Sequence, residues 1–599
     1  MKNNIKTIVD IIKELAYVLD KKQKRYVVAV MVIIVISSFF ELLGVTAVLP
    51  FVQAVLAPEA IFASSIAKPF IEFFHITTPQ GLMLLCGIGI IALYLIKNAY
   101  MLFSYFIQYD FATRVQKELS IKMLKAYMSR PYEYFLNVNS SVVLRGCGSD
   151  TGSVYEILSY LFTIIAEVLA MALIGVFIIY TEPWTALGIL LLMGVVMLGM
   201  VMMFKPAAKK AGVAGRKANA LKGKAIYQTV MGIKEIYVMQ RKKLFVQEYE
   251  RAADIARKAQ RTNSLVTGSP DRIIEGICVS GLVGIICIRL LMNNNMVDFV
   301  PKLAAFAMAA FKVLPSIGKI TSRINGMVYS RPGLTNVYHI IREAAEYEER
   351  YAQYAEEHGA VKESDDLRFG EKLTIQNVAW QYENQKAPVL TDTTLEIKKG
   401  QSIALIGASG AGKTTLADII LGLLHPQEGT VLMDGIDVYA MPKTWARIVG
   451  YVPQSVFLMD DTVRNNIAFG LPEDTIEDEL IWDALERAQL REFVAGLPNG
   501  LDTIVGERGV KFSGGQRQRI AIARALYNKP EILILDEATA ALDNETETAV
   551  MESIDALQGQ ITMIIVAHRL TTIKNCDQIY EIRDGKAVER KKAEVLGTI

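Results

Sequence analysis

The longest apolar stretches of this chain constrain its fold more than any other feature. From Tyr26 to Pro58 the sequence contains a single charged residue, Glu41. A helix that crosses a membrane needs about 20 apolar residues, so this stretch predicts a transmembrane helix with a kink near Pro50. It is too long for the core of a signal peptide and lacks a clear cleavage pattern, so we expect it to be retained. In total we predict six spans, at about 26–50, 81–109, 153–181, 183–204, 271–292 and 299–326.

The distribution of Lys and Arg predicts which side of the membrane each loop faces. Residues 1–25 and 205–261 are rich in basic side chains, whereas 57–80 contains one and the short loops 182–183 and 293–301 contain none. Basic loops stay in the cytoplasm. We therefore expect a multi-pass protein of the cell (inner or plasma) membrane with both termini in the cytoplasm.

Composition divides the chain into a membrane part and a soluble part. Apolar residues concentrate before about residue 330, and charge concentrates after it. We predict a transmembrane domain at 1–342, an acidic linker at 343–366 and a soluble domain at 367–599. The five cysteines have no metal-ligand spacing and are interpreted as buried free thiols.

Three loops carry helical patterns of their own. The predicted cytoplasmic loops 110–152 and 205–270 indicate that the spanning helices continue beyond the lipid, and we expect their tips, near Ser140–Asp150 and Val238–Phe245, to meet the soluble domain. The outer loop 57–80 predicts a short amphipathic helix on the outer leaflet. A loop helix packed on its own bundle is an equal alternative.

Cationic residues inside the predicted spans are candidates for a substrate path. An ionised side chain at the membrane centre costs about 3 kcal/mol on insertion scales, so such residues tend to be functional. Lys312, Lys319 and Arg323 share one helix face, which suits a water-lined path or an anion. Lys97 and Arg272 lie toward the inner ends of their spans and complete the predicted path.

Two alternatives remain for these cations. Four of these side chains lie close enough to the cytoplasmic ends of their spans to extend their charged groups into water: Lys97, Arg272, Lys319 and Arg323. Glu41 and Glu167 lie deep in the first and third spans, where they would neutralise Lys312 in pairs that hold helices together. Glu275 is one turn from Arg272 and would pair with it.

A phosphate-binding loop is predicted in the soluble part. Residues 407–414 match G-x-x-x-x-G-K-[ST] between a β-rich run and a helix-compatible run. In such loops backbone N–H groups surround phosphates, the lysine reaches the β- and γ-phosphates, and the last hydroxyl binds Mg²⁺. Taken alone, the octapeptide also fits a chance glycine loop. The predicted ATP-binding residues here are Gly407, Ser409, Gly410, Gly412, Lys413, Thr414 and Thr415.

A second segment supports the same chemistry. Residues 532–537 form an apolar strand that ends in Asp536 and Glu537. The end of a buried parallel strand faces the phosphate loop, which places Asp536 to hold Mg²⁺ and Glu537 to act as the general base for the attacking water.

Between these segments lies Phe512 followed by Ser513-Gly514-Gly515-Gln516. This run closely resembles the signature of ATP-binding cassette (ABC) transporters, and two glycines before a helix expose N–H groups that suit a γ-phosphate. The chain as a whole resembles an exporter-type half-transporter of that family. The resemblance implies a multidomain membrane protein with a six-helix bundle followed by an α/β P-loop nucleotide-binding domain.

The resemblance also implies further roles in ATP binding. Tyr382 corresponds to the aromatic that stacks on adenine, Gln454 to the Q-loop residue that senses Mg²⁺ and γ-phosphate, Asp543 to the D-loop and His568 to the switch histidine. A lone histidine is usually a core or surface residue. His568 is assigned as the switch histidine because it follows the other motifs in the order that the family has. Mg²⁺ is expected on Thr414, Gln454 and Asp536, and ATP between two copies of the chain. A homodimer is the simplest assembly, and a heterodimer stays open.

Within the exporters, the membrane part looks most like the bacterial lipid-linked oligosaccharide flippases of the PglK type. The resemblance lies in 40–51, 57–75, 270–276 and 311–316. It implies that Lys97, Arg272 and Lys312 guide a pyrophosphate headgroup. Two of the three are lysines, which supply charge without bidentate geometry.

The expected function is therefore an ATPase that moves a polyprenyl-pyrophosphate oligosaccharide or related anionic glycolipid from the inner to the outer leaflet. General efflux of lipids, drugs or peptides is the alternative, and an ATP-gated channel or membrane regulator is a third reading. The six spans exclude a soluble DNA-repair ATPase, and we expect membrane lipid but no nucleic acid as a partner.

Overall fold

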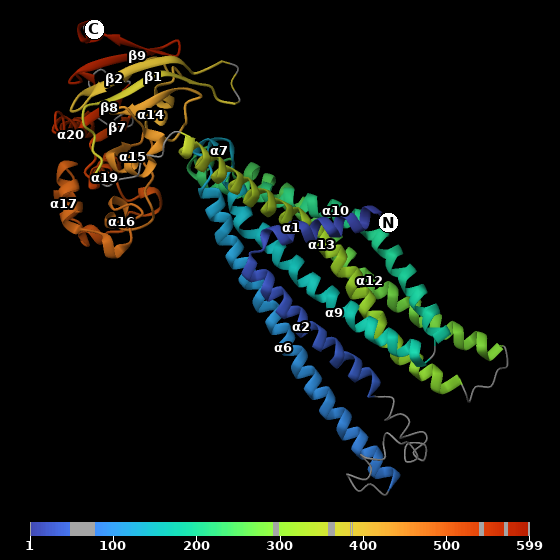
Figure 1. Cartoon of the computed structure of the whole chain (residues 1–599). Coiled ribbons are helices and arrows are strands. Elements are labelled where there is room, and N and C mark those ends of the chain that lie inside the picture. Colours follow the sequence, from blue (N-terminus) through green and yellow to red (C-terminus); the bar gives the residue numbers. More distant parts are fainter. Residues whose placement is uncertain are drawn as a thin grey trace. The chain divides into compact units, whose positions relative to one another are not determined.

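The computed structural model describes residues 2–47, 78–181, 183–291, 299–357, 366–383, 385, 387–537, 544–567 and 573–596. The chain forms two compact units, which are described separately (Figure 1). The helical unit comprises Met1–Arg130 and Val138–Glu348, and the second unit comprises Pro131–Asn137 and Glu349–Ile599. The boundary between them falls within the predicted 343–366 linker.

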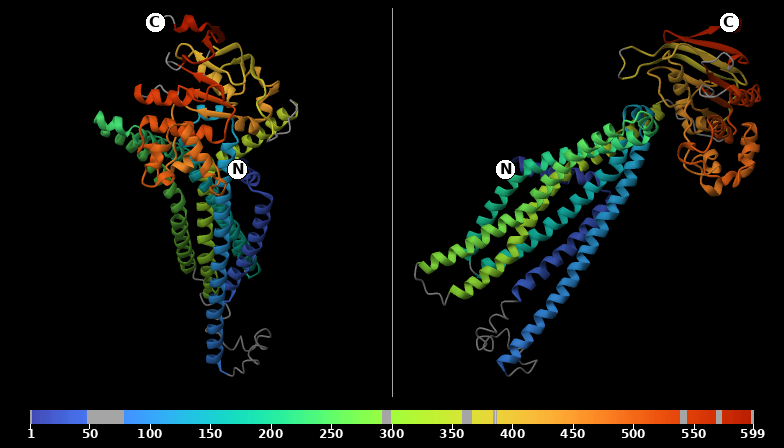
Figure 2. Two further views of the ribbon diagram at one scale, coloured as in Figure 1. Left: turned by 90° about the vertical axis from the view of Figure 1, so that its left-hand side faces the viewer. Right: turned by 180° about the vertical axis from the view of Figure 1, so that it is seen from behind.

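Long helices make up the helical unit. Helices α2, α6 and α9 pack against one another, and α10 packs along α12 (Figure 2). Helix α6 begins at Pro79, with the Thr78 side chain accepting a hydrogen bond from the Gly81 N–H at 3.2 Å. The helices are α1 (Lys2–Val18), α2 (Lys21–Thr46), α6 (Pro79–Met128), α8 (Ser140–Arg145), the π-helix η1 (Gly146–Asp150), α9 (Thr151–Thr181), α10 (Pro183–Met231), α11 (Ile233–Val238), α12 (Lys242–Leu291) and α13 (Phe299–Glu357).

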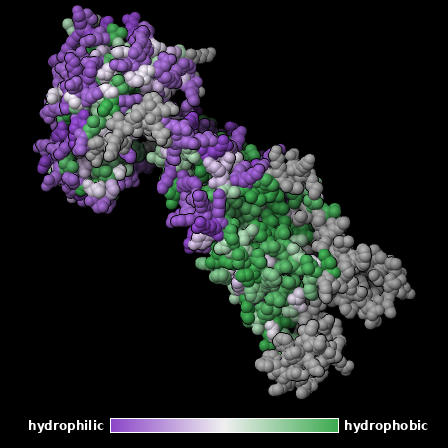
Figure 3. All heavy atoms as spheres, viewed as in Figure 1, coloured by the Kyte–Doolittle hydropathy of each residue, from purple (hydrophilic) through white to green (hydrophobic). Residues whose placement is uncertain are grey.

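Among the described residues, three helical segments are long and apolar enough to cross a membrane. They are Lys21–Thr46, Gln80–Met128 and Ser140–Phe177, which overlap the first three predicted spans. The described residues of the other three predicted spans lie in α10, α12 and α13, and the number of six spans stays a prediction. Apolar side chains cover the middle of this unit on the face shown in Figure 3.

The expected continuation of the spanning helices is confirmed. Helix α6 runs on to Met128, α10 runs on to Met231, and α12 begins at Lys242. Pro50 and nearly all of the outer loop 57–80 lie outside the described residues, so the kink and the outer helix stay predictions.

Two sheets organise the second unit. A six-stranded sheet has the order β10-β9-β3-β8-β7-β6, parallel except for the β10 edge, and a four-stranded antiparallel sheet has the order β2-β1-β4-β5. The strands are β1 (Lys372–Trp380), β2 (Leu390–Lys398), β3 (Ser402–Ile406), β4 (Glu428–Met433), β5 (Ile436–Asp437), β6 (Val449–Val452), β7 (Ile532–Asp536), β8 (Thr562–Val566), β9 (Gln578–Arg583) and β10 (Lys586–Arg590).

Helices flank this parallel sheet. All five residues of β7 and of β8 are buried, as expected for central parallel strands covered on both faces. Side chains alternate between two cores: Leu533 packs with the core that includes α19, whereas Ile534 packs with the core that includes α14. The helices are α14 (Lys413–Ile420), α15 (Pro442–Ile448), α16 (Val463–Ile467), α17 (Asp478–Arg487), α18 (Arg491–Ala495), α19 (Gly514–Tyr527), α20 (Asn544–Asp555) and α22 (Lys592–Leu596), with short 3₁₀ turns at Val438–Ala440, Glu473–Thr475, Gly500–Asp502 and Glu507–Gly509.

One short helix, α7 (Tyr132–Asn137), belongs to the second unit although its neighbours in the chain belong to the first. The Glu133 carboxylate accepts a hydrogen bond from the His425 backbone, and burial raises the pKa of Glu133. The predicted contact of the tips near Ser140–Asp150 and Val238–Phe245 with the soluble domain stays a prediction. In the helical unit, 140–150 forms α8 and η1, and 238–245 spans the end of α11 and the start of α12.

Candidate functional site

The predicted phosphate loop joins the end of β3 to the start of α14. Gly407 has φ +144°, and a Cβ there would lie 2.6 Å from the Ile582 carbonyl oxygen. Gly412 has φ +104°, and a Cβ there would lie 2.9 Å from a methyl of Val389. Both positions therefore require glycine for conformation and for space. The loop leads directly into a helix N-terminus, where backbone N–H groups favour anions.

Lys413 is held beneath this loop. Its side chain is buried, and Nζ donates hydrogen bonds of 3.0 Å to the carbonyl oxygens of Gly407 and Ala408. Burial lowers the pKa of Lys413, while the charges of Glu537 and Asp536 act in the opposite direction. The ammonium group therefore sits between the loop and the carboxylates that end β7, where it can interact with a bound phosphate.

Tyr382 is placed beside the same helix. Its hydroxyl is 3.0 Å from the Thr415 hydroxyl, and its ring packs edge-on against Trp380. The tyrosine is thus fixed next to the phosphate loop, as its predicted adenine contact requires. Thr414, which precedes Thr415 in α14, is exposed and available to a ligand.

The carboxylates that follow β7 meet the predicted Q-loop residue. Gln454 Nε2 donates a 2.6 Å hydrogen bond to Glu537 Oε2. The Glu537 N–H donates to the Val566 carbonyl at 3.0 Å, and the residue has φ +46°, so the backbone turns sharply where the strand ends. Asp536 is buried beside it. The parallel sheet therefore brings together Lys413, Gln454, Asp536 and Glu537.

The residues predicted to hold Mg²⁺ supply a hydroxyl, a carboxamide and a buried carboxylate. These are the oxygen ligands that Mg²⁺ prefers, and Mg²⁺ bound with a nucleotide takes its remaining ligands from phosphates and water. Thr414, Gln454 and Asp536 therefore fit the ion chemically.

The signature residues form the start of a separate helix. Ser513 caps α19: its Oγ accepts the Gln516 N–H at 3.2 Å, and Gln516 Oε1 accepts the Ser513 N–H at 2.8 Å. Gly514 and Gly515 occupy the first turn, whose N–H groups have no intrahelical partner. No hydrogen bond or ion pair among the described residues links Ser513–Gln516 to the phosphate loop. Asp543 and His568 lie outside the described residues.

In the helical unit, Lys97 is paired with Glu41. Lys97 Nζ lies 3.1 Å from Glu41 Oε2, and the side chains are only 12% and 13% exposed. A Cβ on Gly44 would lie 3.2 Å from this lysine, so the glycine gives it room. Glu41 therefore pairs with Lys97, a partner that the sequence reasoning did not name, and its predicted pairing with Lys312 stays a prediction.

Lys319 is paired with Glu167. Lys319 Nζ lies 2.7 Å from one carboxylate oxygen, and the Ser316 hydroxyl donates to the other at 2.6 Å. The lysine is 46% exposed and Glu167 13%, so the charge of Lys319 still reaches the surface.

The remaining predicted path residues differ in exposure. Arg272 forms an ion pair with Glu275 at 3.0 Å, with exposures of 83% and 63%, as the one-turn spacing suggested. Arg323 lies over the Tyr160 ring at 5.3 Å. Lys312 lies in α13, but its side chain is outside those described.

Sequence reasoning missed two acidic residues at these sites. Asp418 lies one turn beyond Thr414 on α14, and burial together with the charge of Asp536 raises its pKa to about 6. Asp271 lies within electrostatic reach of Lys319, Arg323 and Arg272. The four-residue spacing from Thr414 would have indicated Asp418, whereas nothing local indicated which cations Asp271 approaches.

Comparison with known families identifies the family to which a chain with these two units belongs. Residues 390–540 match the family model "ABC transporter", and residues 51–296 match the model "ABC transporter transmembrane region". The chain belongs to the ABC transporter family. The resemblance inferred from the signature is thereby confirmed, and this ABC transporter has the transmembrane and ATP-binding domains expected of it.

Relatives and a solved structure agree with the assignment. The ABC transporter is 29% identical over 488 residues to the ATP-dependent lipid A-core flippase of Methylobacillus flagellatus, covering 81% of this chain and 80% of that one. It is 40% identical over 295 residues to the flippase of the same name from Francisella novicida, covering 49% of this chain and 47% of that one. The latter match thus spans about half the relative's length.

The fold resembles a solved exporter over nearly its whole length. A bacterial Atm1-family ABC exporter with ATP bound matches with a TM-score of 0.73 at 21% identity, covering 96% of this chain and 97% of that one. The exporter-type architecture expected from the sequence is confirmed at the level of the fold.

Proposed function

We propose that this ABC transporter is an ATP-driven exporter that moves an anionic glycolipid from the inner to the outer leaflet. The single observation that carries the ATPase assignment is the hydrogen bond from Gln454 to Glu537, beside buried Asp536 and Lys413. It supports a general base fixed at the end of β7, next to a loop built for phosphates. The relatives named lipid A-core flippase support lipid as the cargo.

In the proposed cycle, ATP binds between the phosphate loop of one copy and Ser513–Gln516 of a second. Thr414, Gln454 and Asp536 would hold Mg²⁺, which would supply positive charge to the phosphates. Glu537 orients and deprotonates the attacking water, and Lys413 stabilises charge on the γ-phosphate. The N–H groups of Gly514 and Gly515 at the start of α19 support this two-copy arrangement, because such donors suit an anion supplied from another chain. His568 and Asp543 complete the proposed site.

The charged helices supply the proposed path for the headgroup. Lys97, Arg272 and Lys319 are each paired with a carboxylate, but Lys319 is 46% exposed, so we assign the headgroup contact to Lys319 together with Arg323 and Lys312. A phosphate that reaches Lys319 competes with Glu167 for the same ammonium group. Transport of an anion therefore requires exchange of ion-pair partners, with little net change in charge along the path.

Substitutions of the acidic and of the basic partner of one ion pair test whether the cargo is negatively or positively charged. Full-length protein in liposomes is assayed for ATPase stimulation and for flipping of a fluorescent polyprenyl-pyrophosphate oligosaccharide. Glu167→Gln releases Lys319 and should increase apparent affinity for this lipid, whereas Lys319→Gln and Lys312→Ala should reduce it. A cationic cargo reverses both signs and would move the assignment to general efflux.

The identity of the glycolipid is tested in the same vesicles. We propose the lipid-linked oligosaccharide as cargo, with both chain termini and the ATPase domain in the cytoplasm and a homodimer as the working unit. A lipid A-core glycolipid is the competing substrate. If the lipid A-core glycolipid is flipped faster than the lipid-linked oligosaccharide, and its flipping depends on Lys319 to the same extent, the proposed cargo is wrong and the proposed mechanism stands. ATP hydrolysis without movement of any lipid would favour a channel or regulator.

A further inference from the structure

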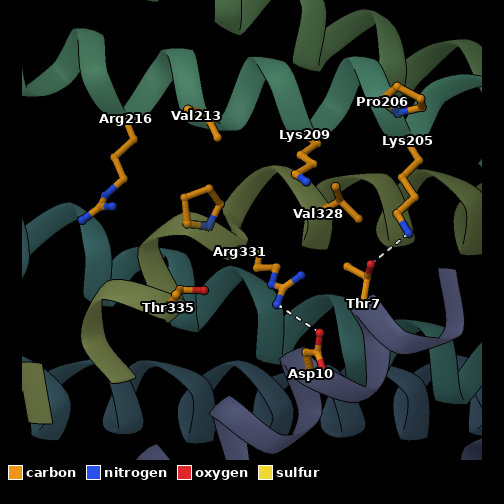
Figure 4. Close-up of a pocket in the computed structure, with 11 residues that line it drawn as sticks. Thr7, Asp10, Lys205, Pro206, Lys209, Val213, Arg216, Val328, Arg331 and Thr335 are labelled. Atoms are coloured by element: carbon orange, nitrogen blue, oxygen red, sulfur yellow. Dashed lines mark hydrogen bonds and ion pairs between the residues drawn. The ribbon is translucent and has the colours of Figure 1, made fainter. Parts of the chain in front are cut away.

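A cavity of about 800 Å³ lies in the helical unit, apart from the residues assigned to the substrate path (Figure 4). It is lined by side chains from α1, α10 and α13, and none of Lys97, Arg272, Lys319 or Arg323 contributes to it. Its polar lining includes Thr7, Asp10, Lys205, Lys209, Arg216 and Arg331.

Two prolines inside long helices line this cavity. Pro206 lies within α10 and Pro332 within α13, and both line the space. A proline inside a helix removes one backbone hydrogen bond and pushes its ring against the preceding turn, which bends the helix.

The lining carries four cationic side chains and one acidic one. Arg331 lies 3.4 Å from Asp10 and 3.3 Å from Glu14, and Arg216 lies 3.4 Å from Asp150. These carboxylates balance the two guanidinium groups. Lys205 and Lys209 also line the cavity, and neither takes part in those pairs.

The lysines are arranged to receive an anion. Lys205 Nζ donates to the Thr7 hydroxyl at 3.1 Å, and Lys209 is exposed, with no ion pair or hydrogen bond in the part of the chain that the structure describes. Burial, together with repulsion from Lys209 and Arg331, lowers the pKa of Lys205. An anion in the cavity would relieve that repulsion.

The position along the chain indicates where such an anion comes from. Lys205 directly follows the predicted fourth span, Arg331 follows the predicted sixth, and Thr7 precedes the first. The positive-inside distribution puts all three at the cytoplasmic surface, at the depth of lipid phosphates. Val213, 54% exposed, adds an apolar side chain to the lining.

We propose that this cavity binds the phosphate of an anionic phospholipid of the inner leaflet, with Lys205 and Lys209 as its principal contacts and Thr7 as a hydroxyl donor. The site holds the lipid between α1, α10 and α13, so occupancy links the N-terminal helix to two long helices. The lipid is a bound regulator, distinct from the transported molecule.

Direct lipid binding tests the site. Full-length protein in a neutral detergent is titrated with dioleoyl phosphatidylglycerol or dioleoyl phosphatidylcholine, and bound lipids are counted by native mass spectrometry. Wild type should bind one phosphatidylglycerol more tightly than the rest and show no such preference for phosphatidylcholine. The Lys205→Gln/Lys209→Gln variant should lose at least about tenfold in affinity for that first lipid, because each basic residue near an anionic lipid contributes about 1 kcal/mol.

The matched control carries Lys210→Gln and Lys217→Gln. Both residues lie on α10, are exposed and do not line the cavity, so the change in net charge is identical. If both double variants lose the same affinity for phosphatidylglycerol, the lipid is attracted to the basic surface of the protein in general. That result would overturn the proposal. Because Lys209 is exposed, Lys209→Gln alone provides a variant whose folding is not at risk, and it should give a smaller loss in the same direction.

Free anions separate the two sources of phosphate. Glycerol phosphate or inorganic phosphate, added in the presence of phosphatidylglycerol, should displace the first lipid only in large excess. Displacement at concentrations comparable to the lipid shows a site for soluble phosphates and overturns the assignment to a membrane lipid.

Discussion

Gln454 Nε2 donates a 2.6 Å hydrogen bond to Glu537 Oε2, joining the strand end after β6 to the strand end after β7. The two strands pair in parallel, so their carboxyl ends meet at one edge of the sheet. Because a carboxamide can also ligate a metal ion, this contact links the proposed general base to the proposed Mg²⁺ site through one side chain.

The role of Glu537 is tested by Glu537→Gln. The substitution keeps a side chain that can accept the bond from Gln454 and removes the base, so hydrolysis should fall by about 100-fold or more while ATP binding persists. Phosphate release at steady state and retention of labelled ATP measure the two effects. Near-normal turnover would exclude Glu537 as the base.

Two glycines of the phosphate loop should respond differently to alanine. Gly410 and Gly412 both have positive φ, and alanine costs about 1–2 kcal/mol there. At Gly412 a Cβ would also lie 2.9 Å from Val389, whereas at Gly410 nothing lies within 4 Å. Gly412→Ala should therefore weaken ATP binding by about tenfold more than Gly410→Ala, a difference of about 1.4 kcal/mol. Nucleotide titrations followed by thermal shift compare them, and equal effects would contradict the packing argument.

Asp418 predicts a pH dependence of stability. Its pKa of about 6 in the folded protein lies above the ordinary aspartate value of 3.8, so the native state binds the proton more tightly. Ionisation of Asp418 therefore costs stability as the pH rises from about 4 to 6. Asp418→Asn should stabilise the second unit at pH 7.5, by about 1 kcal/mol after allowance for solvent screening, and have no such effect below pH 4.

An exposed aspartate gives the control of opposite sign. Hydrogen bonds from Asn377 and Lys586 lower the pKa of Asp392, so this residue contributes stability above pH 4 that is lost on acidification. Asp392→Asn should lower the unfolding midpoint at pH 7.5. Scanning calorimetry of the full-length variants across pH compares the two, and the same sign in both would refute the electrostatic explanation.

The ion pair between Lys97 and Glu41 should matter more for folding than that between Arg272 and Glu275. Removing one partner of a buried pair leaves a charge without compensation, so Glu41→Gln should destabilise by about 3 kcal/mol or more. Glu275→Gln, in an exposed pair, should cost less than about 1 kcal/mol.

The double variant Glu41→Gln/Lys97→Gln separates structure from transport. It should recover most of the lost stability, measured as the thermal midpoint in detergent. If the double variant also transports at the wild-type rate, Lys97 only holds helices together and is not part of the substrate path. If transport is lost although stability is restored, Lys97 is part of that path.

The nucleotide site was predictable because its chemistry is local. The glycines around Lys413 and the apolar strand before Asp536 are contiguous in sequence, and parallel pairing of buried strands then brings them to one edge. Tertiary folding adds the contact of Tyr382 with Thr415 and the hydrogen bond from Gln454 to Glu537.

The pairing of charges between helices was only partly predictable. Glu275 is within one turn of Arg272, so that pair follows from helix geometry. The pairing of Lys97 with Glu41, or of Lys319 with Glu167, depends on how separate helices rotate and pack, and a single sequence does not specify those rotations.

Helix α7 makes the second unit discontinuous in the chain, because Pro131–Asn137 folds with Glu349–Ile599. A fragment cut out at Glu349 would lack a piece of its own surface and leave the partners of Glu133 facing solvent. Exchanging this cassette between related transporters thus requires moving a seven-residue insert along with it, since those residues and their binding surface have to vary together.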